Sequence, residues 1–286
     1  MKRFIWILLL LIHSLQAGNL KENLTTLLER GYSVGYLKEY MQPMATSVGL
    51  MLGSAAYHSG GVKPFPSFDI GLKGAYVIIP EEARYFVSKE LAGGEEQKVP
   101  TVFGNSYPAN EAIAGIDKNA FRFPLLQLNL GMFNNVELMV RFSQYENKDL
   151  GRMTVWGGGV KYGLSDLLIM SIVPVQVSVQ AMYHTFSLDD YISSGAFAMN
   201  LHASSDIPKT IFSVYSGVSY ENSSMVIKTD LLPVAPEDSY GSVTINGNNK
   251  FKYSVGISAE YLIFNLHADY NFGYYHSIAG GLMIVF

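Results

Sequence analysis

The last residues of the chain, 276–286, read HSIAGGLMIVF, and this stretch ends inside an apolar, alternating pattern. Its large apolar residues fall on one face of a strand at a period of two: Ile278, Leu282, Ile284 and Phe286. Small residues begin the other face: Ser277, Ala279 and Gly281. Soluble domains usually end in frayed tails that reach into water. An apolar ending therefore indicates a strand whose outer face is covered by something other than water.

The same alternation recurs along most of the chain. In 264–272, for example, Phe264, Leu266, Ala268, Tyr270 and Phe272 alternate with polar residues. Similar patterns, with turn residues between them, predict ten strands: 67–79, 122–132, 135–146, 152–163, 173–187, 195–205, 210–230, 249–261, 263–272 and 276–286. The 19 Tyr, 16 Phe and 27 Gly also favour β-structure with many turns.

Alternation occurs both in soluble β-sandwiches and in transmembrane β-barrels. Strand length separates the two classes, because globular strands average about five or six residues, whereas a tilted strand needs about nine to eleven to cross a bilayer. Every backbone group must be paired in lipid, so such strands close into a barrel. The sequence therefore predicts an all-β transmembrane antiparallel barrel of ten to twelve strands with a short N-terminal helical segment.

The N-terminus predicts export. Residues 1–17, MKRFIWILLLLIHSLQA, combine a basic start, an apolar run and a small residue at Ala17, which is typical of a cleaved signal peptide. After this segment no apolar run is long enough for a membrane-spanning helix. The chain contains no cysteine, so it forms no disulfides and carries no lipid-anchoring cysteine. We therefore expect the bacterial outer membrane as its location.

Connection lengths indicate the direction of the strands. Outer-membrane barrels have short periplasmic turns and longer outer loops. With ten strands, the long outer loops are 80–121 and 232–248. A twelve-strand alternative divides 210–230 at ENSS (221–224) and counts 45–57 as a strand, but it places the longest loop in the periplasm. Ten is the expected number.

Residues 18–66 precede the expected barrel at 67–286 and begin with a helical pattern. Leu20, Leu24, Leu27 and Leu28 form a stripe on one helix face, and Gly31 is a suitable helix end. Two placements remain open for this segment: a periplasmic helix packed on the barrel mouth, or a plug inside the lumen. A barrel of ten or twelve strands leaves a slim passage that a plug would fill.

Four stretches resemble an uncharacterised family of Gram-negative outer-membrane barrels, itself distantly similar to long-chain fatty-acid transporters. They are YLKEYMQPMATSVGLMLGSAAYH (36–58), FDIGLKGAYVIIP (68–80), TVFG (101–104) and NLHADYNFGYYHSIAGGLMIVF (265–286). The resemblance implies an N-terminal hatch that occludes the barrel and a hydrophobic ligand that leaves sideways toward lipid. The sequence has Ala55-Ala56-Tyr57 where those transporters carry an Asn-Pro-Ala hatch motif, and it has fewer expected strands than they have.

The C-terminal strand, with Ile278, Leu282, Ile284 and Phe286, also resembles the signal by which outer-membrane barrels are recognised for insertion. We therefore expect the barrel-assembly machinery and outer-membrane lipid as partners.

Polar residues on the face opposite the apolar one would line the lumen. They carry both signs of charge: Asp69, Lys73, Glu137, Arg141, Lys161, His184, His202, Lys250, Lys252, Glu260, His267 and Asp269. Mixed signs favour ion pairs that hold a narrow lumen shut. The alternative is that these groups line a permeation path.

Enzymatic and metal chemistry have little support in the sequence. His267 and Asp269 share a strand face, and His184 precedes Asp189 and Asp190, yet spacing ties no serine to either histidine and no Gly-x-Ser-x-Gly motif occurs. The histidines do not cluster as metal ligands would, and the scattered basic residues do not indicate nucleic-acid binding. We expect no catalytic site, metal or cofactor.

The function implied by the resemblance is passage or uptake of a small hydrophobic molecule, with loop 80–121 capturing it and the hatch moving. A non-transporting structural or surface-contact barrel is the second hypothesis, and an outer-membrane enzyme is the third.

Overall fold

The computed structural model describes residues 20–91, 94–105, 112–147, 151–165 and 174–286. The expected signal peptide lies outside these residues. The described chain begins with two helices, α2 (Leu20–Glu29) and α3 (Val34–Gly53). Smaller elements lie in the long connections: η1 (Glu81–Arg84), β2 (Tyr85–Ser88), β3 (Gln97–Pro100), η2 (Thr229–Leu231), η3 (Pro236–Asp238) and β10 (Ser242–Asn246).

Ten strands of the described chain form one closed antiparallel barrel. They are β1 (Phe68–Ile78), β4 (Ala120–Gly131), β5 (Val136–Asn147), β6 (Gly151–Gly163), β7 (Val175–Leu188), β8 (Ile192–Asp206), β9 (Phe212–Lys228), β11 (Phe251–Tyr261), β12 (Phe264–Phe272) and β13 (His276–Val285). The wall closes because β1 pairs with β4 on one side and with β13 on the other. β9 pairs with β11 along its first half and with the short β10 near its end.

The ten-strand prediction is confirmed, and the twelve-strand alternative is wrong. Residues 45–53 belong to α3, and ENSS (221–224) continues through β9 without a break. The polar residues of ENSS fit a strand because Glu221 and Ser223 face a polar interior, while Asn222 and the rest of the outward face stand beside water, as described below.

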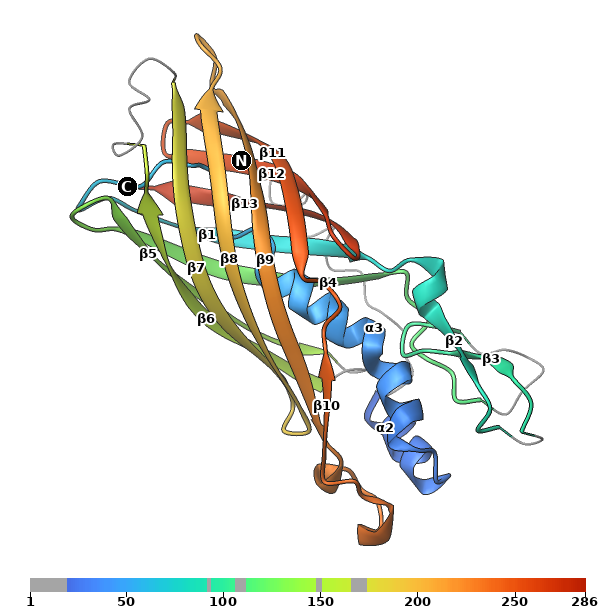
Figure 1. The fold of residues 1–286 in the computed structure, drawn as a ribbon. Helices are drawn as coiled ribbons and strands as arrows, with labels where there is room; N and C mark the ends of the chain where they lie inside the picture. Colours follow the sequence, from blue (N-terminus) through green and yellow to red (C-terminus); the bar gives the residue numbers. More distant parts are fainter. Residues whose placement is uncertain (1–19, 92–93, 106–111, 148–150, 166–173) are drawn as a thin grey trace, which may run out of the picture.

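The two ends of the barrel differ (Figure 1). At the short-turn end, the backbone N–H of Phe68 donates to the carbonyl of Phe286 at 3.0 Å, so the first and last strands meet there. At the opposite, loop end lie α2, the β2–β3 hairpin and β10. Outer-membrane barrels keep their short turns in the periplasm, so we expect the loop end to face outward.

Aromatic side chains mark both borders of the outward apolar belt. The exposed rings at the short-turn end are Phe68, Tyr162, Phe212, Tyr261, Phe264 and Phe286. Those toward the loop end are Trp156, Tyr183, Phe197, Tyr220, Phe251, Tyr253 and Phe272. Cross-strand pairs such as Tyr183 with Phe197 and Tyr220 with Phe251 keep this second ring at one level. Transmembrane barrels carry such girdles at both membrane interfaces.

Above the upper girdle, the strands that continue into the cap exchange their polar and apolar faces, as β9 and β7 show. On β9 the inward residues change from Ser219 and Glu221 to Met225 and Ile227, whereas the outward residues change from apolar to polar at Asn222. β7 repeats the change, because inward His184 is followed by inward Phe186 and Leu188. The strands therefore leave the membrane at the girdle and continue as the wall of a water-facing, apolar-cored unit.

We call this unit the cap. It comprises α2, residues 34–43 of α3, the described parts of 79–119, and residues 120–125, 143–147, 151–155, 185–195 and 222–246. One continuous apolar cluster fills it, joining the helix residues Leu24, Tyr40 and Met41 to wall residues such as Phe123 and Ile227.

Helix α3 runs from the cap into the barrel (Figure 1). Beyond Pro43 its sequence is MATSVGLMLG, which is rich in small residues, so the helix packs closely on the wall. A Cβ atom added at Gly53 would lie 2.3 Å from Oε1 of Glu221, and one at Gly49 would lie 2.1 Å from the Ser223 hydroxyl oxygen. Among the described residues, no helix is long and apolar enough to cross a membrane.

Candidate functional site: the filled lumen and the seam above it

Two cations of the barrel wall hold the C-terminal end of α3. Arg141 of β5 donates from Nη1 to the carbonyl of Leu52 at 3.0 Å, and Lys252 of β11 donates to the carbonyl of Gly53 at 2.7 Å. The last carbonyls of a helix lack helical partners and carry the negative end of its dipole. Glu221 contacts Lys252 at 2.7 Å and balances its charge. We call Arg141 and Lys252 the latch.

Residues 54–66, which we call the strap, continue through the lumen to the start of β1. Wall side chains hold the strap mainly by its backbone: Gln127 donates to the carbonyl of Ala56 at 3.2 Å, and the N–H of Gly60 donates to the Ser204 hydroxyl at 2.8 Å. The hydroxyl oxygens of Ser54 and Ser277 are 3.3 Å apart. Residues 44–66 thus fill the lumen as a plug, with α2 and residues 34–43 in the cap rather than at the short-turn mouth.

A buried charge cluster joins the strap to β1 and β4. Asp69 accepts from Asn129 at 2.6 Å and lies 3.1 Å from the Nζ of Lys63. Lys73 lies 3.3 Å from Nδ1 of His58, whose Nε2 is 3.7 Å from Asp69. Buried charges are tolerated when they are paired and hydrogen-bonded in this way. The cluster ties the lower lumen together.

Further polar contacts line the interior around this cluster. Lys161 lies 3.6 Å from Glu137, which also accepts from the N–H of Lys63 at 3.1 Å. Asp269 accepts from the hydroxyl of Tyr215 at 3.0 Å. With the plug set aside, the wall of the lumen carries four buried cations and four buried anions: Lys73, Arg141, Lys161, Lys252, Asp69, Glu137, Glu221 and Asp269.

Inward glycines make room for the plug and for large lumen side chains. Tyr57 of the strap stacks on His202 with ring centroids 4.0 Å apart, and its hydroxyl lies over Gly217. A Cβ atom at Gly217 would lie only 2.4 Å from that oxygen. Gly157, in the run GGGVKYG, makes the same kind of space for His184. Glycine in a strand often marks such a close approach.

A cavity of about 590 Å³ opens at the short-turn end, below the strap. Its charged lining residues include Lys63, Glu137, Lys161, Asp206 and Glu260. Residues of the strap, from His58 to Pro64, line one side of it.

Most of the expected lumen residues lie buried inside the barrel: Asp69, Lys73, Glu137, Arg141, Lys161, His184, His202, Lys252, His267 and Asp269. Two do not. Lys250 precedes β11 and donates to the outward Asn222 at 2.6 Å, because the chain has not yet entered the wall there. Glu260 lies exposed at the rim of the short-turn cavity, where β11 ends.

The terminal strand presents the expected insertion residues on the lipid-facing side. Ile278 and Phe286 are half exposed, and Leu282 and Ile284 share their face, whereas Ser277 and Met283 are buried inside.

Sequence reasoning missed several lumen residues that alternation could have identified. Glu221, the partner of Lys252, stands on the inward face of the long strand 210–230, and Gln127 and Asn129 stand on the inward face of 122–132. All three follow from the strand period. Their contacts with the plug do not, because those contacts depend on how the barrel closes.

The two acid–base pairs considered in the sequence are not joined by any hydrogen bond among the described residues. His267 contacts Asn265 through Nδ1, and Asp269 is occupied by Tyr215 and Asn271. His184 is buried in the lumen, whereas Asp189 accepts from the backbone of Arg152 at the loop end. Within the described residues, no group of three His, Asp or Glu is arranged to hold a metal ion.

The wall has a seam between β4 and β5. The two strands pair from Gly131 with Glu137 up to Leu126 with Phe142, and the pairing stops there. Above this point 120–125 stay paired with β1, and 143–147 stay paired with β6. The separation begins close to the upper girdle, where Phe142 packs on Trp156 with centroids 4.4 Å apart.

Apolar rings of the cap interior reach the seam. Phe123 lies edge-to-face with Tyr145 across it, at 6.4 Å between centroids, and with Phe186 at 6.5 Å. Tyr145 belongs to the inward face of β5, yet 37% of its surface is exposed. At the seam, the cap interior is therefore covered by side chains such as Phe123 and Tyr145, and not by a hydrogen-bonded strand ladder.

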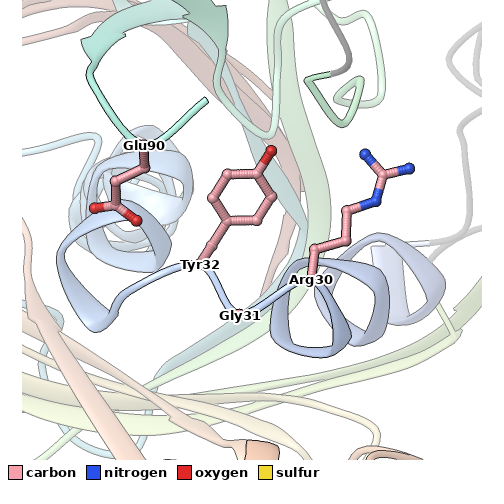
Figure 2. A pocket seen from close by; sticks show the side chains of 4 residues that line it. All are labelled: Arg30, Gly31, Tyr32 and Glu90. Atoms are coloured by element: carbon pink, nitrogen blue, oxygen red, sulfur yellow. The ribbon is translucent and has the colours of Figure 1, made fainter. Parts of the chain in front are cut away.

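The cap also has an open pocket of about 550 Å³ at its outer end, shown in Figure 2. Arg30 and Tyr32 extend from the turn between α2 and α3, and Glu90 lies at one side. Glu90 accepts from the N–H and the hydroxyl of Ser33, the residue that caps α3. Burial raises the pKa of the nearby Tyr36, so its hydroxyl remains protonated.

Structural similarity to solved proteins is at the level of architecture. OmpT, an outer membrane protein of Vibrio cholerae, is 8% identical with a TM-score of 0.30, over 75% of this chain and 64% of OmpT. This chain therefore spans less than two thirds of OmpT's length. The toluene transporter TbuX of Ralstonia pickettii is 7% identical with a TM-score of 0.28, over 86% of this chain and 92% of that one. The outer membrane phospholipase A of Escherichia coli is 8% identical with a TM-score of 0.26, over 78% and 98%.

These values assign no activity to the chain. No curated protein matches its sequence. The fold resembles that of bacterial outer-membrane β-barrels. The expected membership of an uncharacterised barrel family is confirmed. Over residues 1–286 the sequence matches the family described as "Family of unknown function (DUF6588)", and the chain belongs to that family.

Proposed function

We propose that this protein admits a small hydrophobic molecule to the outer leaflet of the outer membrane through the seam between β4 and β5. The observation that carries the proposal is the end of strand pairing at Leu126 and Phe142, beside an apolar cap interior. The molecule enters the cap from outside, crosses between the rings at the seam, and leaves into lipid. No catalytic step is involved, and outer-membrane lipid is the receiving phase.

The lumen is unsuited to a hydrophobic molecule. Its wall carries paired charges, and α3 with the strap fills the space between them. A hydrophobe passing there would separate charged groups from their partners and offer no hydrogen bonds in exchange, at a cost of several kcal/mol for each ion. A lateral route avoids this cost because it stays among apolar side chains.

Pro124 gives a physical reason for the seam. It lies in β4 two residues above the last pair with β5. Proline has no N–H to donate to a strand ladder and is found mainly at sheet edges. Its presence disfavours a full ladder between the upper halves of β4 and β5.

The test substitutes Pro124→Val and measures outer-membrane entry of the hydrophobic dye N-phenyl-1-naphthylamine in cells that produce the protein. Valine restores an N–H and favours strand structure, so we expect the ladder to extend and dye entry to fall toward that of cells without the protein. Amide hydrogen exchange of residues 143–147 should slow in the same variant. Pro233→Val is the matched control, because Pro233 lies exposed in the outer loop and not in the wall.

Slower exchange at 143–147 with unchanged dye entry would refute the seam as the route. If wild-type protein does not raise dye entry at all, the second hypothesis takes its place: a non-transporting barrel that anchors the cap for contacts at the surface. The closed lumen and the large folded cap support that alternative.

A further inference from the structure

We infer that the cavity at the short-turn end is a binding site for a small zwitterion, with Lys161 holding its carboxylate and the acidic rim at Asp206 and Glu260 facing its ammonium group. The cavity lies below the strap, whereas the seam begins at the upper girdle, so the test of this site does not depend on the uptake of a hydrophobic molecule. Three observations carry the inference: a buried cation with spare donors, the charge of the rim, and the size and apolar lining of the cavity.

Lys161 is buried but has few partners. Only 5% of its surface is exposed, and it lines the cavity. Its Nζ lies 3.6 Å from Glu137, which is beyond hydrogen-bond distance, and its ammonium makes no other polar contact with a described residue. A lysine ammonium has three donors, and a buried charge without hydrogen bonds is costly. Lys161 can therefore donate to an acceptor inside the cavity.

The other three buried cations of the lumen wall are already occupied. Arg141 and Lys252 donate to the end of α3, and Lys73 lies 3.3 Å from Nδ1 of the strap's histidine at position 58. Glu137 accepts from the backbone N–H of Lys63 at 3.1 Å, so its carboxylate has a hydrogen bond that does not involve Lys161. An anionic group that binds Lys161 therefore displaces no hydrogen bond of the wall.

The rim of the cavity is acidic. Asp206 at the end of β8 and Glu260 near the end of β11 are exposed lining residues, and neither side chain is paired with another described residue. Lys209 also lies at the rim, so two carboxylates and one ammonium leave one net negative charge there. This rim attracts the ammonium end of a zwitterion whose carboxylate reaches Lys161, and it repels a dianion such as phosphate.

The size and the lining of the cavity suit a small organic molecule. Its volume of about 590 Å³ lies within the range of about 300–1,000 Å³ that is usual for small-molecule sites. Such sites combine apolar walls with a few placed polar groups. The apolar lining comes from the strap and from two short turns: Val62, Pro64, Ile207, Ile211 and Leu262. A dipeptide with an apolar first residue matches this lining.

The experiment measures binding of the dipeptide leucylglycine to the refolded full-length protein in micelles by isothermal titration calorimetry. Leucylglycinamide lacks the carboxylate and should bind at least about tenfold more weakly, because it loses a charge-assisted hydrogen bond to Lys161. N-acetyl-leucylglycine lacks the ammonium group and should bind about threefold more weakly, since charges at an exposed rim are screened by water and salt.

Two double variants test the two ends of the site. Lys161→Met with Glu137→Gln removes both charges, so that no unpaired charge stays buried, and should weaken leucylglycine binding by at least about tenfold. Asp206→Asn with Glu260→Gln should bind leucylglycine and its N-acetyl form equally well. Lys209→Gln is the matched control for the loss of a lining lysine and should change the affinity by no more than about twofold.

Four results would overturn the inference. A folded, heat-modifiable wild type that binds no leucylglycine at millimolar concentrations removes the site. Equal binding of leucylglycine and leucylglycinamide, or unchanged binding in the folded Lys161→Met, Glu137→Gln variant, removes the role of Lys161. Equal binding of the N-acetyl form to the wild type would make the ligand a simple carboxylate instead of a zwitterion. If the Lys161 variant does not fold, the three ligands on the wild type decide the question.

Discussion

The barrel within the membrane and the cap above it share several strands. The polar and apolar faces of those strands are exchanged between the two regions. Between the girdles, outward residues such as Val218 face lipid, and inward residues such as Glu221 form a hydrogen-bonded polar interior. Above the upper girdle, Asn222 faces outward, and Ile227 is buried in an apolar core. The change occurs within a few residues of one strand, without a bulge or break in β9. The solvent on each side, rather than the strand itself, decides which face is apolar.

The two regions also hold the plug differently. In the cap, burial of large apolar side chains fixes α2 and the start of α3. In the barrel, small residues bring the helix close to the wall, and polar side chains bind its backbone. Apolar side chains of α3 are also buried in the barrel, among them Met44, Val48 and Met51. The barrel adds polar contacts to the C-terminal end of the helix.

The largest expected effect tests the apolar interior of the cap. Ile227→Lys places a charge in a site without exposed surface, and an unpaired buried charge costs about 3–5 kcal/mol. We expect that loss in urea unfolding of the refolded protein in micelles, followed by the fluorescence of Trp156, the only tryptophan after the expected signal peptide. The control Ser224→Lys, on the outward face nearby, should change stability by no more than about 0.5 kcal/mol. Equal losses in both variants would contradict the exchange of faces.

A smaller effect tests the position of the membrane border. Val218→Lys points a cation at lipid below the girdle, which costs about 2–4 kcal/mol in transmembrane barrels near the midplane. Asn222→Lys, four residues further on the same face, should cost about 0–1 kcal/mol because it lies at or above the interface. Unfolding in phospholipid vesicles measures both. If Asn222→Lys destabilises the protein as much as Val218→Lys does, the membrane border lies further along the strand, toward the end of β9.

The smallest effect tests how closely the strap fits the wall. Gly217→Ala brings a Cβ atom against the Tyr57 hydroxyl and against Cβ of His202, at 2.4 and 2.8 Å, so neighbouring atoms must shift. We expect a loss of about 1–3 kcal/mol, the usual cost of overpacking. Gly74→Ala, whose Cβ atom would point outward with its nearest neighbour at 3.4 Å, is the control and should be neutral. A neutral Gly217→Ala would mean that Tyr57 does not occupy this position in the folded protein.

Much of the fold follows from local pattern. Alternation located the strands within a few residues, and its parity placed Asp69, Arg141 and His267 on the inner face. Lys250 shows where parity fails, because it lies just before β11 begins and the wall does not yet constrain its direction. Parity also could not reveal the exchange of faces. Phe186 lies on the same face of β7 as His184. No residue between them indicates that the strand leaves the membrane there.

The site depended much more on tertiary structure. The small residues of 44–56 are compatible with a strand, a helix on the mouth or a plug, and the sequence left these placements open. The structure places them inside the lumen, where the wall glycines and the latch receive them. The seam has one local signal, Pro124, but its meaning depends on where the pairing with β5 stops.

By itself the sequence determined a barrel of ten to twelve strands with a polar interior, because the period of a strand is a property of the backbone and acts over a few residues. The tertiary structure decided what the interior contains and where the strand pairing of the wall stops. Lys252 binds the carbonyl of Gly53 although 199 positions separate them. Such a contact exists only after ten strands have closed around the N-terminal segment, since closure alone brings those two residues to the same level of the lumen.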